Sequence, residues 1–389
     1  MKLSELDVLL NGMMKCTEGV SDLNFTVGRP YQVEAHGELK PVKLGGELRN
    51  LTAIDTEEIA NTLVGGDSNL QKILQETGAC DCAYALPDGT RFRVNVFKVR
   101  GNYSIVLRVL PIRIPTLQEL NLPAIFEEIT QLRNGMVLVT GSTGSGKSTT
   151  LASIIDRINA TRGVHIVTLE DPIEFGHPHK KGTINQRELG LDFPSFHEGL
   201  RAALRQAPKV ILVGEMRDRP TVEIALKAAE TGHLVLSTLH TIDAGQTINR
   251  IMGMFEPSEQ RLIRSRVSQV LRFVIGQRLL PKKGGGRVAA MEIMGTNLRV
   301  RELILSDEDT DKTFYGVIAD SRPYGWQTFD QHIIDLFEKD LITEEVAKSY
   351  CTDASVITLG VDQIRAARGE DTSDLGPLEM AFTRKIRRS

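Results

Sequence analysis

The chain has 389 residues, so we expect two domains, or one large domain with a smaller one. Hydrophobic residues make up 41% and charged residues 25%, and the net charge of −3 gives no general attraction to nucleic acid or anionic lipid. No apolar run approaches the roughly 18 residues that a membrane span needs, and the N-terminus lacks a signal-peptide core, so we expect a cytoplasmic protein.

Residues 1–113 predict a separate α+β domain. Apolar residues at helical spacing predict helices at 4–13, 56–63 and 70–76. Alternation of apolar and polar residues predicts strands at 22–27, 31–35, 38–42, 83–86, 92–99 and 103–109. Turn residues such as Pro87-Asp88-Gly89 separate the last three strands, which we interpret as a meander.

The cysteines indicate a reducing compartment. The chain has four of them, Cys16, Cys80, Cys82 and Cys351, and they form no paired C-x-x-C zinc pattern. Cys80 and Cys82 have one residue between them, and the other two are isolated in the sequence. We interpret them as reduced core or surface thiols.

Closely spaced prolines mark a domain boundary. Pro111-Ile112-Arg113-Ile114-Pro115 predicts an extended linker over about 111–116, because each proline also biases its predecessor away from the helical region. We expect the second domain to cover 117–365 and to open with a helix at 117–132. A polar tail with a basic end follows over 366–389, and we expect it to be mobile.

A phosphate-binding loop lies early in the second domain. The pattern G-x-x-x-x-G-K-[ST] is met at every fixed position by Gly141, Ser142, Thr143, Gly144, Ser145, Gly146, Lys147 and Ser148, with Thr149 following. A buried strand is predicted at 136–140 and an amphipathic helix after the loop, which is the context that the motif needs. Backbone N–H groups and the helix N-terminus then face one phosphate chain. Lys147 is expected to reach the β- and γ-phosphates, and Ser148 to ligate Mg²⁺.

This loop gives the arginines of the first domain a second interpretation. Arg91, Arg93, Arg100 and Arg108 are dense for a domain without net basicity. They are either solvated strand residues, or one or two of them reach the nucleotide. Guanidinium donors suit the charge on a transferring phosphoryl group.

Acidic residues follow the next predicted strand, 164–169. Glu170, Asp171 and Glu174 come at its carboxyl end, where sheets of this kind bind ligands. Hydrolysis of the γ-phosphate needs a carboxylate that acts as a base or positions water. Spacing does not choose among these three acids, and all three could equally be loop and cap residues.

Two later strands also end in polar residues. The apolar run 210–213 is followed by Gly214 and Glu215, a pattern typical of a Walker B strand, whose acid orients Mg²⁺ or its water. A helix is expected over 218–230. The strand 234–239 then ends at His240, which either senses the γ-phosphate or is an ordinary structural histidine.

The rest of the chain predicts one more strand and several helices. The strand is expected at 288–294, after Gly284-Gly285-Gly286, and helices are expected at 329–338 and 344–350. No Cys or third His completes a metal site near His177 and His179, so we interpret that pair as loop residues. Alternating strands and helices make the fold class α/β.

Four motifs occur together and in order: GSTGSGKSTT, VTLEDPIEF, VILVGEMRD and TGHLVLSTLHT. With them the chain resembles the PilT/PilU twitching-motility ATPases of type IV pili. The resemblance runs from Gly19 to Gln331. It implies a homo-hexamer of subunits with an N-terminal PAS-like domain and a C-terminal RecA-like motor, which hydrolyses ATP with Mg²⁺ to drive pilus retraction. It also implies a place at the inner-membrane pilus base, with the platform protein as partner and without nucleic acid.

The resemblance also implies roles for single residues. Lys147 and Ser148 bind phosphate and Mg²⁺, Glu215 is the Walker B acid, and His240 closes the His box. Glu174, at the end of the Asp box, becomes the catalytic base. Arg93 and Arg108 become arginine fingers that reach the nucleotide, including across a subunit boundary, with Arg91 and Arg113 as further candidates.

Other functions stay open. The retraction motif AIRNLIRE is only partly present, as RVRELILS at 299–306, which leaves an accessory PilU-like motor as an alternative. A pilus-assembly or secretion ATPase commonly carries a four-cysteine module, and this chain has no cysteine between Cys82 and Cys351. A nucleic-acid translocase would carry a basic, aromatic-rich channel, whereas aromatic residues are 5% of this chain.

Overall fold

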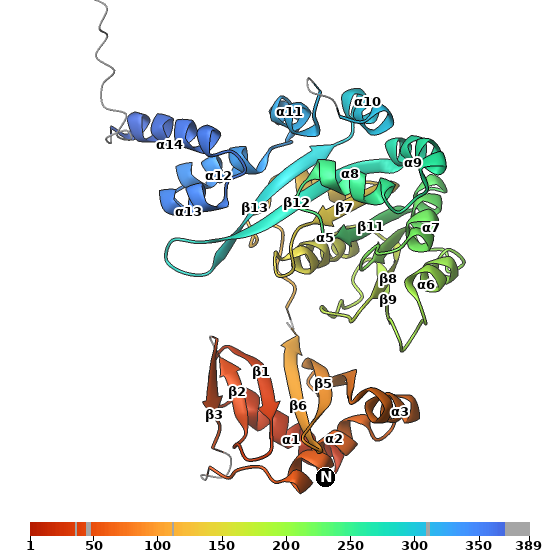
Figure 1. Ribbon diagram of the computed structural model, residues 1–389, viewed down its shortest axis with the longest axis vertical. Coiled ribbons are helices and arrows are strands. Elements are labelled where there is room, and N and C mark those ends of the chain that lie inside the picture. The colour runs from red at the N-terminus through yellow and green to blue at the C-terminus, as the bar shows by residue number, and fades with distance from the viewer. Residues whose placement is uncertain (36, 44–47, 111–112, 309–311, 370–389) are drawn as a thin grey trace, which may run out of the picture. The chain divides into compact units, whose positions relative to one another are not determined.

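A computed structural model describes residues 1–35, 37–43, 48–110, 113–308 and 312–369. The chain divides into two compact units (Figure 1). The first comprises Met1–Ile114 together with Pro172–His177, and the second comprises Pro115–Asp171 and Pro178–Ser389. Among the helices of the described ranges, none is both long and apolar enough to cross a membrane.

The first unit is built on a six-stranded antiparallel sheet with the order β3-β2-β1-β6-β5-β4. Its strands are β1 (Val20–Phe25), β2 (Gln32–Ala35), β3 (Glu38–Pro41), β4 (Ala79–Ala85), β5 (Arg91–Val99) and β6 (Asn102–Leu110). Its helices are α1 (Leu3–Met14), α2 (Ala53–Val64) and α3 (Ser68–Thr77). The predicted helices, hairpin and meander are confirmed. β4 starts earlier than predicted because Gly78, at φ +81°, ends α3 and leads directly into the strand.

Strand alternation gives this sheet one apolar face. Phe92, Val94 and Val96 of β5 are fully buried and pack in one core with residues of all three helices, whereas Arg93 of the same strand is exposed. Side chains of a strand point alternately to opposite faces, so the arginines of β5 lie on the other face of the sheet.

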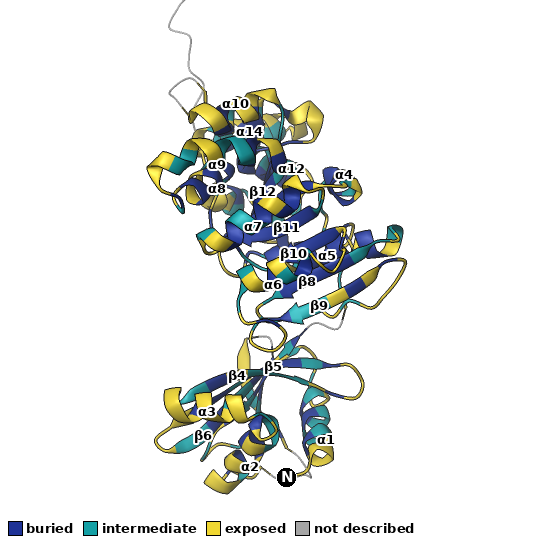
Figure 2. Cartoon of the chain, turned by 90° about the vertical axis from the view of Figure 1, so that its right-hand side faces the viewer, coloured by how far each residue is buried: buried dark blue, intermediate teal, exposed yellow. Residues whose placement is uncertain are grey.

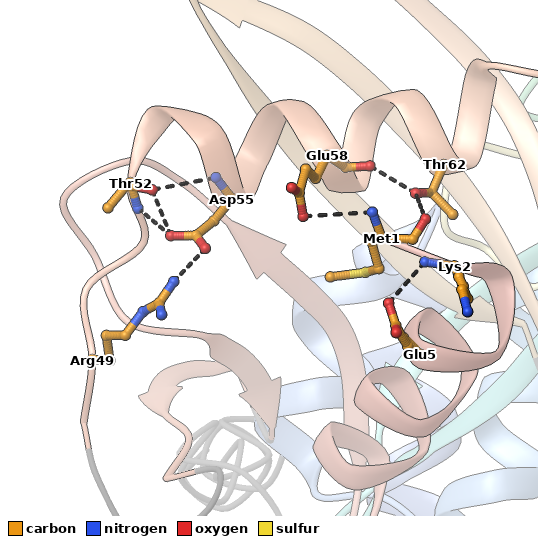
Figure 3. A network of polar contacts seen from close by, with 8 residues as sticks. All are labelled: Met1, Lys2, Glu5, Arg49, Thr52, Asp55, Glu58 and Thr62. Atoms are coloured by element: carbon orange, nitrogen blue, oxygen red, sulfur yellow. Dashed lines mark hydrogen bonds and ion pairs between the residues drawn. The ribbon is translucent and has the colours of Figure 1, made fainter.

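Polar contacts fix the starts of α1 and α2 (Figure 3). The Lys2 backbone N–H donates to Glu5 at 2.8 Å, and the Thr52 backbone N–H donates to Asp55 at 2.7 Å. The Thr62 hydroxyl donates to the Met1 carbonyl at 3.1 Å, which joins the N-terminus to α2. α2 thus starts with a reciprocal capping box between Thr52 and Asp55, whereas at α1 only the Glu5 half is present, because a lysine ammonium cannot accept a hydrogen bond.

The second unit is built on a seven-stranded sheet with the order β13-β12-β7-β11-β10-β8-β9. Its strands are β7 (Gly135–Thr140), β8 (His165–Glu170), β9 (Thr183–Glu188), β10 (Val210–Val213), β11 (Leu234–Leu239), β12 (Leu271–Pro281) and β13 (Arg287–Gly295). All neighbouring strands pair in parallel except β12 and β13, which form an antiparallel hairpin.

Helices cover both faces of this sheet. They are α4 (Ile125–Gln131), α5 (Lys147–Thr161), α6 (Phe196–Ala203), α7 (Arg219–Glu230), α8 (Ala244–Met252), α9 (Pro257–Val270), α10 (Leu298–Ser306) and α11 (Phe314–Ala319). Val137 and Val139 of β7 pack with α4 and α5, and Met136 and Leu138 pack with the other six helices. The inner strands are therefore buried on both sides (Figure 2). This is the expected form of a parallel sheet and confirms the α/β fold class.

The C-terminal helices pack on the far end of the β12–β13 hairpin (Figure 1). They are α12 (Phe329–Glu338), α13 (Glu344–Tyr350) and α14 (Ala354–Arg368). Phe329 and Ile333 of α12 share a core with Leu280 and Val288 of the hairpin. α14 runs past residue 365, where we predicted the domain to end, and residues 370–389 of the predicted tail lie outside the described residues.

Some elements of this unit differ from the predictions. The helix predicted at 117–132 is wrong over 117–124, because Asn121 has a left-handed φ of +53° and Pro123 has no N–H to continue a helix. The sequence analysis also placed no element at β9, α6, α8, α9, β12, α10, α11 or α14. β12 is the consequential omission, since it pairs with β7 directly beside the phosphate loop.

Two buried titratable groups lie where the hairpin meets its neighbours. Glu292 of β13 is 4% exposed and accepts a hydrogen bond from the Ala244 N–H at 2.8 Å, and its burial raises the pKa to about 7 from an ordinary 4.5. His332 of α12 is 5% exposed and accepts one from the Met291 N–H at 2.9 Å, and its burial lowers the pKa to about 4 from an ordinary 6.5. Desolvation disfavours the charged form of each group.

These opposite shifts predict the pH dependence of stability. Glu292 contributes fully to the free energy of unfolding below about pH 4.5. This contribution is lost as the pH rises to about 7, because the Glu292 carboxyl ionises at lower pH in the unfolded chain than in the folded protein. Glu292→Gln removes this loss. We expect the variant to gain about 3 kcal/mol over the wild type between pH 4.5 and pH 8, measured as the difference in urea unfolding free energy. The exposed Glu345→Gln is the control and should show no such gain. If the difference in unfolding free energy between Glu292→Gln and the wild type stayed constant from pH 4.5 to pH 8, the raised pKa of Glu292 would be contradicted.

Candidate nucleotide site

The predicted phosphate loop joins β7 to α5. Gly146 precedes the first residue of α5 with a left-handed φ of +87°. The Lys147 side chain is 7% exposed, and its Nζ donates to the carbonyls of Gly141 at 2.8 Å and Ser142 at 2.9 Å. Strand, loop and helix therefore follow one another as the motif requires, with Ser148 exposed in the first helical turn.

Parallel pairing brings two more predicted residues to this edge of the sheet. Thr140, at the end of β7, is level with Leu239, at the end of β11, and His240 follows directly. β10 pairs with the other side of β11, and Glu215 follows that strand after one residue. His240 Nε2 lies 3.5 Å from Glu215 Oε2. Sequence reasoning placed Lys147 and Ser148 in the phosphate loop and Glu215 and His240 after the ends of two strands. All four residues lie in the second unit.

The environment of Glu215 suits a magnesium ion. Its side chain is 12% exposed, and Arg217 forms an ion pair with Oε1. Oε2 is buried and accepts no hydrogen bond from any described residue. A buried carboxylate oxygen without a hydrogen bond is costly, and Mg²⁺ prefers such oxygens together with water. Glu215 and the Ser148 hydroxyl fit as the protein groups that would hold Mg²⁺, directly or through water.

A cavity of about 390 Å³ lies over the loop. One side of the cavity is the loop itself, from Gly141 to Ser145. The rest of its lining comes from elements that the loop motif does not contain, namely Ile242, Gln277, Arg278, Leu279, Arg287 and Tyr350. β12 and the C-terminal end of α13 therefore line the same cavity as the loop.

The three candidate acids after β8 differ in their surroundings. Glu170 accepts hydrogen bonds from the Thr168 hydroxyl at 2.6 Å and from Gln186 Nε2 at 3.0 Å, so its carboxylate joins β8 to β9. Asp171 is exposed and ends the first segment of the second unit. Glu174 is exposed and lies in Pro172–His177, which groups with the first unit. Glu170 thus has a structural role that the sequence could not reveal.

The predicted arginine fingers belong to the first unit and face each other across two strands. Arg93 of β5 is the register partner of Arg108 of β6, and Arg108 in turn is the register partner of Asp22 of β1. Arg108 Nε donates to Asp22 at 2.9 Å, while its side chain remains 67% exposed. Like charges directly opposite each other destabilise an antiparallel pair, whereas the nearly buried Asp22 carboxylate on the next strand offsets part of this repulsion.

Sequence reasoning missed the site residues on β12. Gln277 donates from Nε2 to the Ser145 carbonyl at 2.7 Å, and Arg278 donates to the Tyr350 carbonyl at 2.7 Å. No motif marks these residues, because they come about 130 positions after the loop and reach it through strand pairing. A predicted strand at 271–281 would have been the signal to look for.

Comparisons with known proteins identify the family of the chain. A family model described as type II/IV secretion system protein matches residues 82–311, which is more than half of the chain. The chain is 41% identical over 332 residues to the type IV pilus retraction ATPase PilT of Pseudomonas aeruginosa, covering 85% of this chain and 94% of that protein. It is 34% identical over 384 residues to the type IV pilus ATPase PilU of the same organism, covering 98% and 97%.

A solved structure shows the same fold. It is a crystal structure of the pilus retraction motor PilT with bound ADP, which matches with a TM-score of 0.82 at 41% identity over 91% of this chain and 98% of that one. The chain belongs to the type II/IV secretion ATPase family. The matches to PilT and PilU cover 94% and 97% of those proteins, and the predicted resemblance to PilT/PilU ATPases is confirmed. The description of the first unit as PAS-like stays a prediction.

Family membership and geometry together predict the effect of removing His240. We expect His240→Ala to lower kcat for ATP hydrolysis by about 10²-fold, because it removes a polar group that faces the buried Glu215 carboxylate at the ligand edge. MgADP affinity should change little, since the loop keeps its own contacts. Steady-state kinetics and calorimetric titration measure the two effects.

His233→Ala is the matched control. His233 precedes the same strand, β11, at its opposite end, where its Nδ1 lies 2.9 Å from the Ala228 carbonyl. This variant should keep the wild-type kcat. Equal kcat values for the two variants would show that His240 is an ordinary structural histidine.

Proposed function

We propose that this protein binds MgATP on the loop 141–149 and hydrolyses it to power retraction of a type IV pilus. The observation that carries the proposal is that the loop, Glu215 and His240 lie at one edge of a parallel sheet. The match to PilT, which covers 94% of that protein, supports it. The name PilT belongs to the relative, and its retraction activity is carried over here as a proposal.

The residues divide the chemistry of hydrolysis. Backbone N–H groups of the loop and the Lys147 ammonium bind the phosphates, and ATP would displace the two loop carbonyls from Lys147. Ser148 and Glu215 would hold Mg²⁺, which when bound would supply positive charge beside the transferring phosphoryl group. Glu174 takes a proton from the attacking water, and His240 senses the γ-phosphate beside Glu215. The exposed position of Glu174 is compatible with a base that must meet water.

Arginine fingers would complete the site in an assembled homo-hexamer. Arg93 and Arg108 form an exposed pair whose mutual repulsion is unfavourable for the sheet by itself. The Asp22 carboxylate offsets this repulsion only in part, and a phosphoryl group would offset more of it, because guanidinium groups suit phosphoryl oxygens. We propose that one or both reach the nucleotide of a neighbouring subunit, so that hydrolysis depends on assembly.

A second candidate function is that of an accessory PilU-like motor. The PilU match covers 98% of this chain, against 85% for PilT, and so includes nearly all of the C-terminal region. The partial retraction motif at 299–306 lies in α10 and favours the same alternative. In both functions we propose a cytoplasmic protein that works at the inner-membrane pilus base with the platform protein.

Activity across a protein concentration series tests the assembled site. We expect Mg²⁺-dependent ATPase activity per subunit to rise with the hexamer fraction measured by mass photometry. Glu174→Gln should lower kcat by at least about 10²-fold with MgADP binding retained. Arg108→Ala should lower it by about 10³-fold in the hexamer, the range for an arginine finger. Lys147→Ala should lose nucleotide binding.

Lys98→Ala is the control for Arg108. Lys98 lies on β5 five residues after Arg93, is exposed, and has its side chain on the other face of the sheet. The Lys98→Ala variant should hydrolyse ATP at the wild-type rate. A monomer as active as the hexamer, together with an active Arg108→Ala, would overturn the inter-subunit mechanism.

A complementation experiment tests the cellular function. Wild-type protein, but not Lys147→Ala, should restore twitching to cells that lack their retraction motor. Restoration only alongside a second motor would favour the accessory function.

A further inference from the structure

Gln277 of β12 makes two hydrogen bonds that hold the phosphate loop. The side chain is 3% exposed. Nε2 donates to the Ser145 carbonyl at 2.7 Å, and Oε1 accepts from the Thr150 hydroxyl at 2.8 Å. One carboxamide therefore joins the loop to the first turns of α5, and the hydroxyl of Thr150 fixes which way the carboxamide is turned.

Two glycines of the loop lie against this residue. A Cβ at Gly146 would come within 2.8 Å of Gln277 Nε2, and a Cβ at Gly141 within 2.4 Å of the Gln277 backbone carbonyl. Their φ angles of +87° and +143° are also values that favour glycine. The glycines thus serve packing against β12 in addition to the approach of a phosphate chain.

The hydrogen bond to Ser145 determines where the next N–H points. The peptide unit between Ser145 and Gly146 is planar and trans, so its N–H points opposite to its carbonyl. Gln277 holds the carbonyl on the β12 side of the loop. The Gly146 N–H is thereby directed away from the Gln277 carboxamide, and N–H groups of such loops bind phosphate oxygens.

The strand gives Gln277 a rigid base. Its neighbour Gly276 pairs with Thr140 of β7, and Gln277 itself pairs with Met291 of β13. The next residue, Arg278, lies 3.8 Å from the Phe329 ring and donates to the Tyr350 carbonyl, which anchors β12 to the C-terminal helices. The carboxamide is thus presented from a strand fixed on both sides, so it can hold the loop in one conformation before nucleotide arrives.

We propose that Gln277 is a positioning residue of this ATPase, which pre-organises the phosphate loop by orienting the Ser145–Gly146 peptide. The inference rests on the proposed nucleotide site. Gln277 acts through the loop, without touching the reacting atoms. Its loss should raise the cost of ordering the loop around phosphate, and so should weaken nucleotide binding while leaving the groups of hydrolysis in place.

Gln277→Leu tests this proposal, with Gln327→Leu as the matched control. Gln327 is 8% exposed in the same unit and donates from Nε2 to the Met291 carbonyl at 3.2 Å, away from the loop. Both substitutions delete a buried amide bonded to a backbone carbonyl, so we expect similar falls in the thermal midpoint. Calorimetric titration with MgADP should give a Kd about 10-fold higher for Gln277→Leu only, the effect of one lost hydrogen bond in a buried site. In steady-state kinetics KM should rise by a similar factor, with kcat within about 3-fold of the wild type.

Thr150 supplies a second test if Gln277→Leu does not fold. Thr150→Val removes the hydroxyl that orients the carboxamide and should raise the MgADP Kd by about 3-fold, whereas Thr150→Ser should restore it. Where Gln277→Leu does fold, the effect of Thr150→Val should disappear in the double variant, because the partner of the hydroxyl is already gone.

The outcomes separate this proposal from the proposed site. If Lys147→Ala binds MgADP as tightly as the wild type, the loop is not the nucleotide site. If Lys147→Ala loses binding but Gln277→Leu and Gln327→Leu bind MgADP equally well, the site stands and the positioning role is wrong. Equal MgADP Kd values for Thr150→Val and Thr150→Ser would also overturn the positioning role of Gln277.

Discussion

Parallel pairing of β7, β11 and β10 is the constraint on which the candidate site depends. Parallel strands in register end at the same edge, so three segments separated by up to 100 positions in sequence deliver their following residues to one place. The register that makes Thr140 level with Leu239 sets His240 beside the loop, and the pairing of Val213 with Ser237 does the same for Glu215. A shift of one residue would also turn the buried faces outward, so packing on both sides of the sheet protects the geometry.

Burial then gives the site its chemistry. Glu215 is nearly enclosed, with one buried oxygen that no described residue satisfies, and a carboxylate in that state favours a cation. The Lys147 ammonium is enclosed too and is bonded to loop carbonyls. Opposite charges are thus held close to the loop in a weakly screened environment, where electrostatic interactions with phosphate and Mg²⁺ are strong.

The β12–β13 hairpin connects this edge to the rest of the second unit. Gln277 holds the loop, and the adjacent Arg278 holds the end of α13, so one strand contacts both. Glu292 and His332 are buried in the same region with opposite pKa shifts, and between about pH 4.5 and 6.5 their effects on stability oppose each other. These polar groups are therefore arranged along the β12–β13 hairpin, which carries no recognisable motif.

The sequence by itself determined the local features. The phosphate loop, the strand before it and the acid after β10 follow from residue types within about ten positions, because turn chemistry and apolar periodicity act over that range. The family resemblance added Glu174 and the arginines, which spacing alone had left open. Only the tertiary structure decided that Glu170 bonds to Gln186, that Arg93 lies opposite Arg108, and that Gln277 reaches Ser145. These contacts join residues that are distant in sequence, and strand order and register, which no local pattern encodes, bring them together.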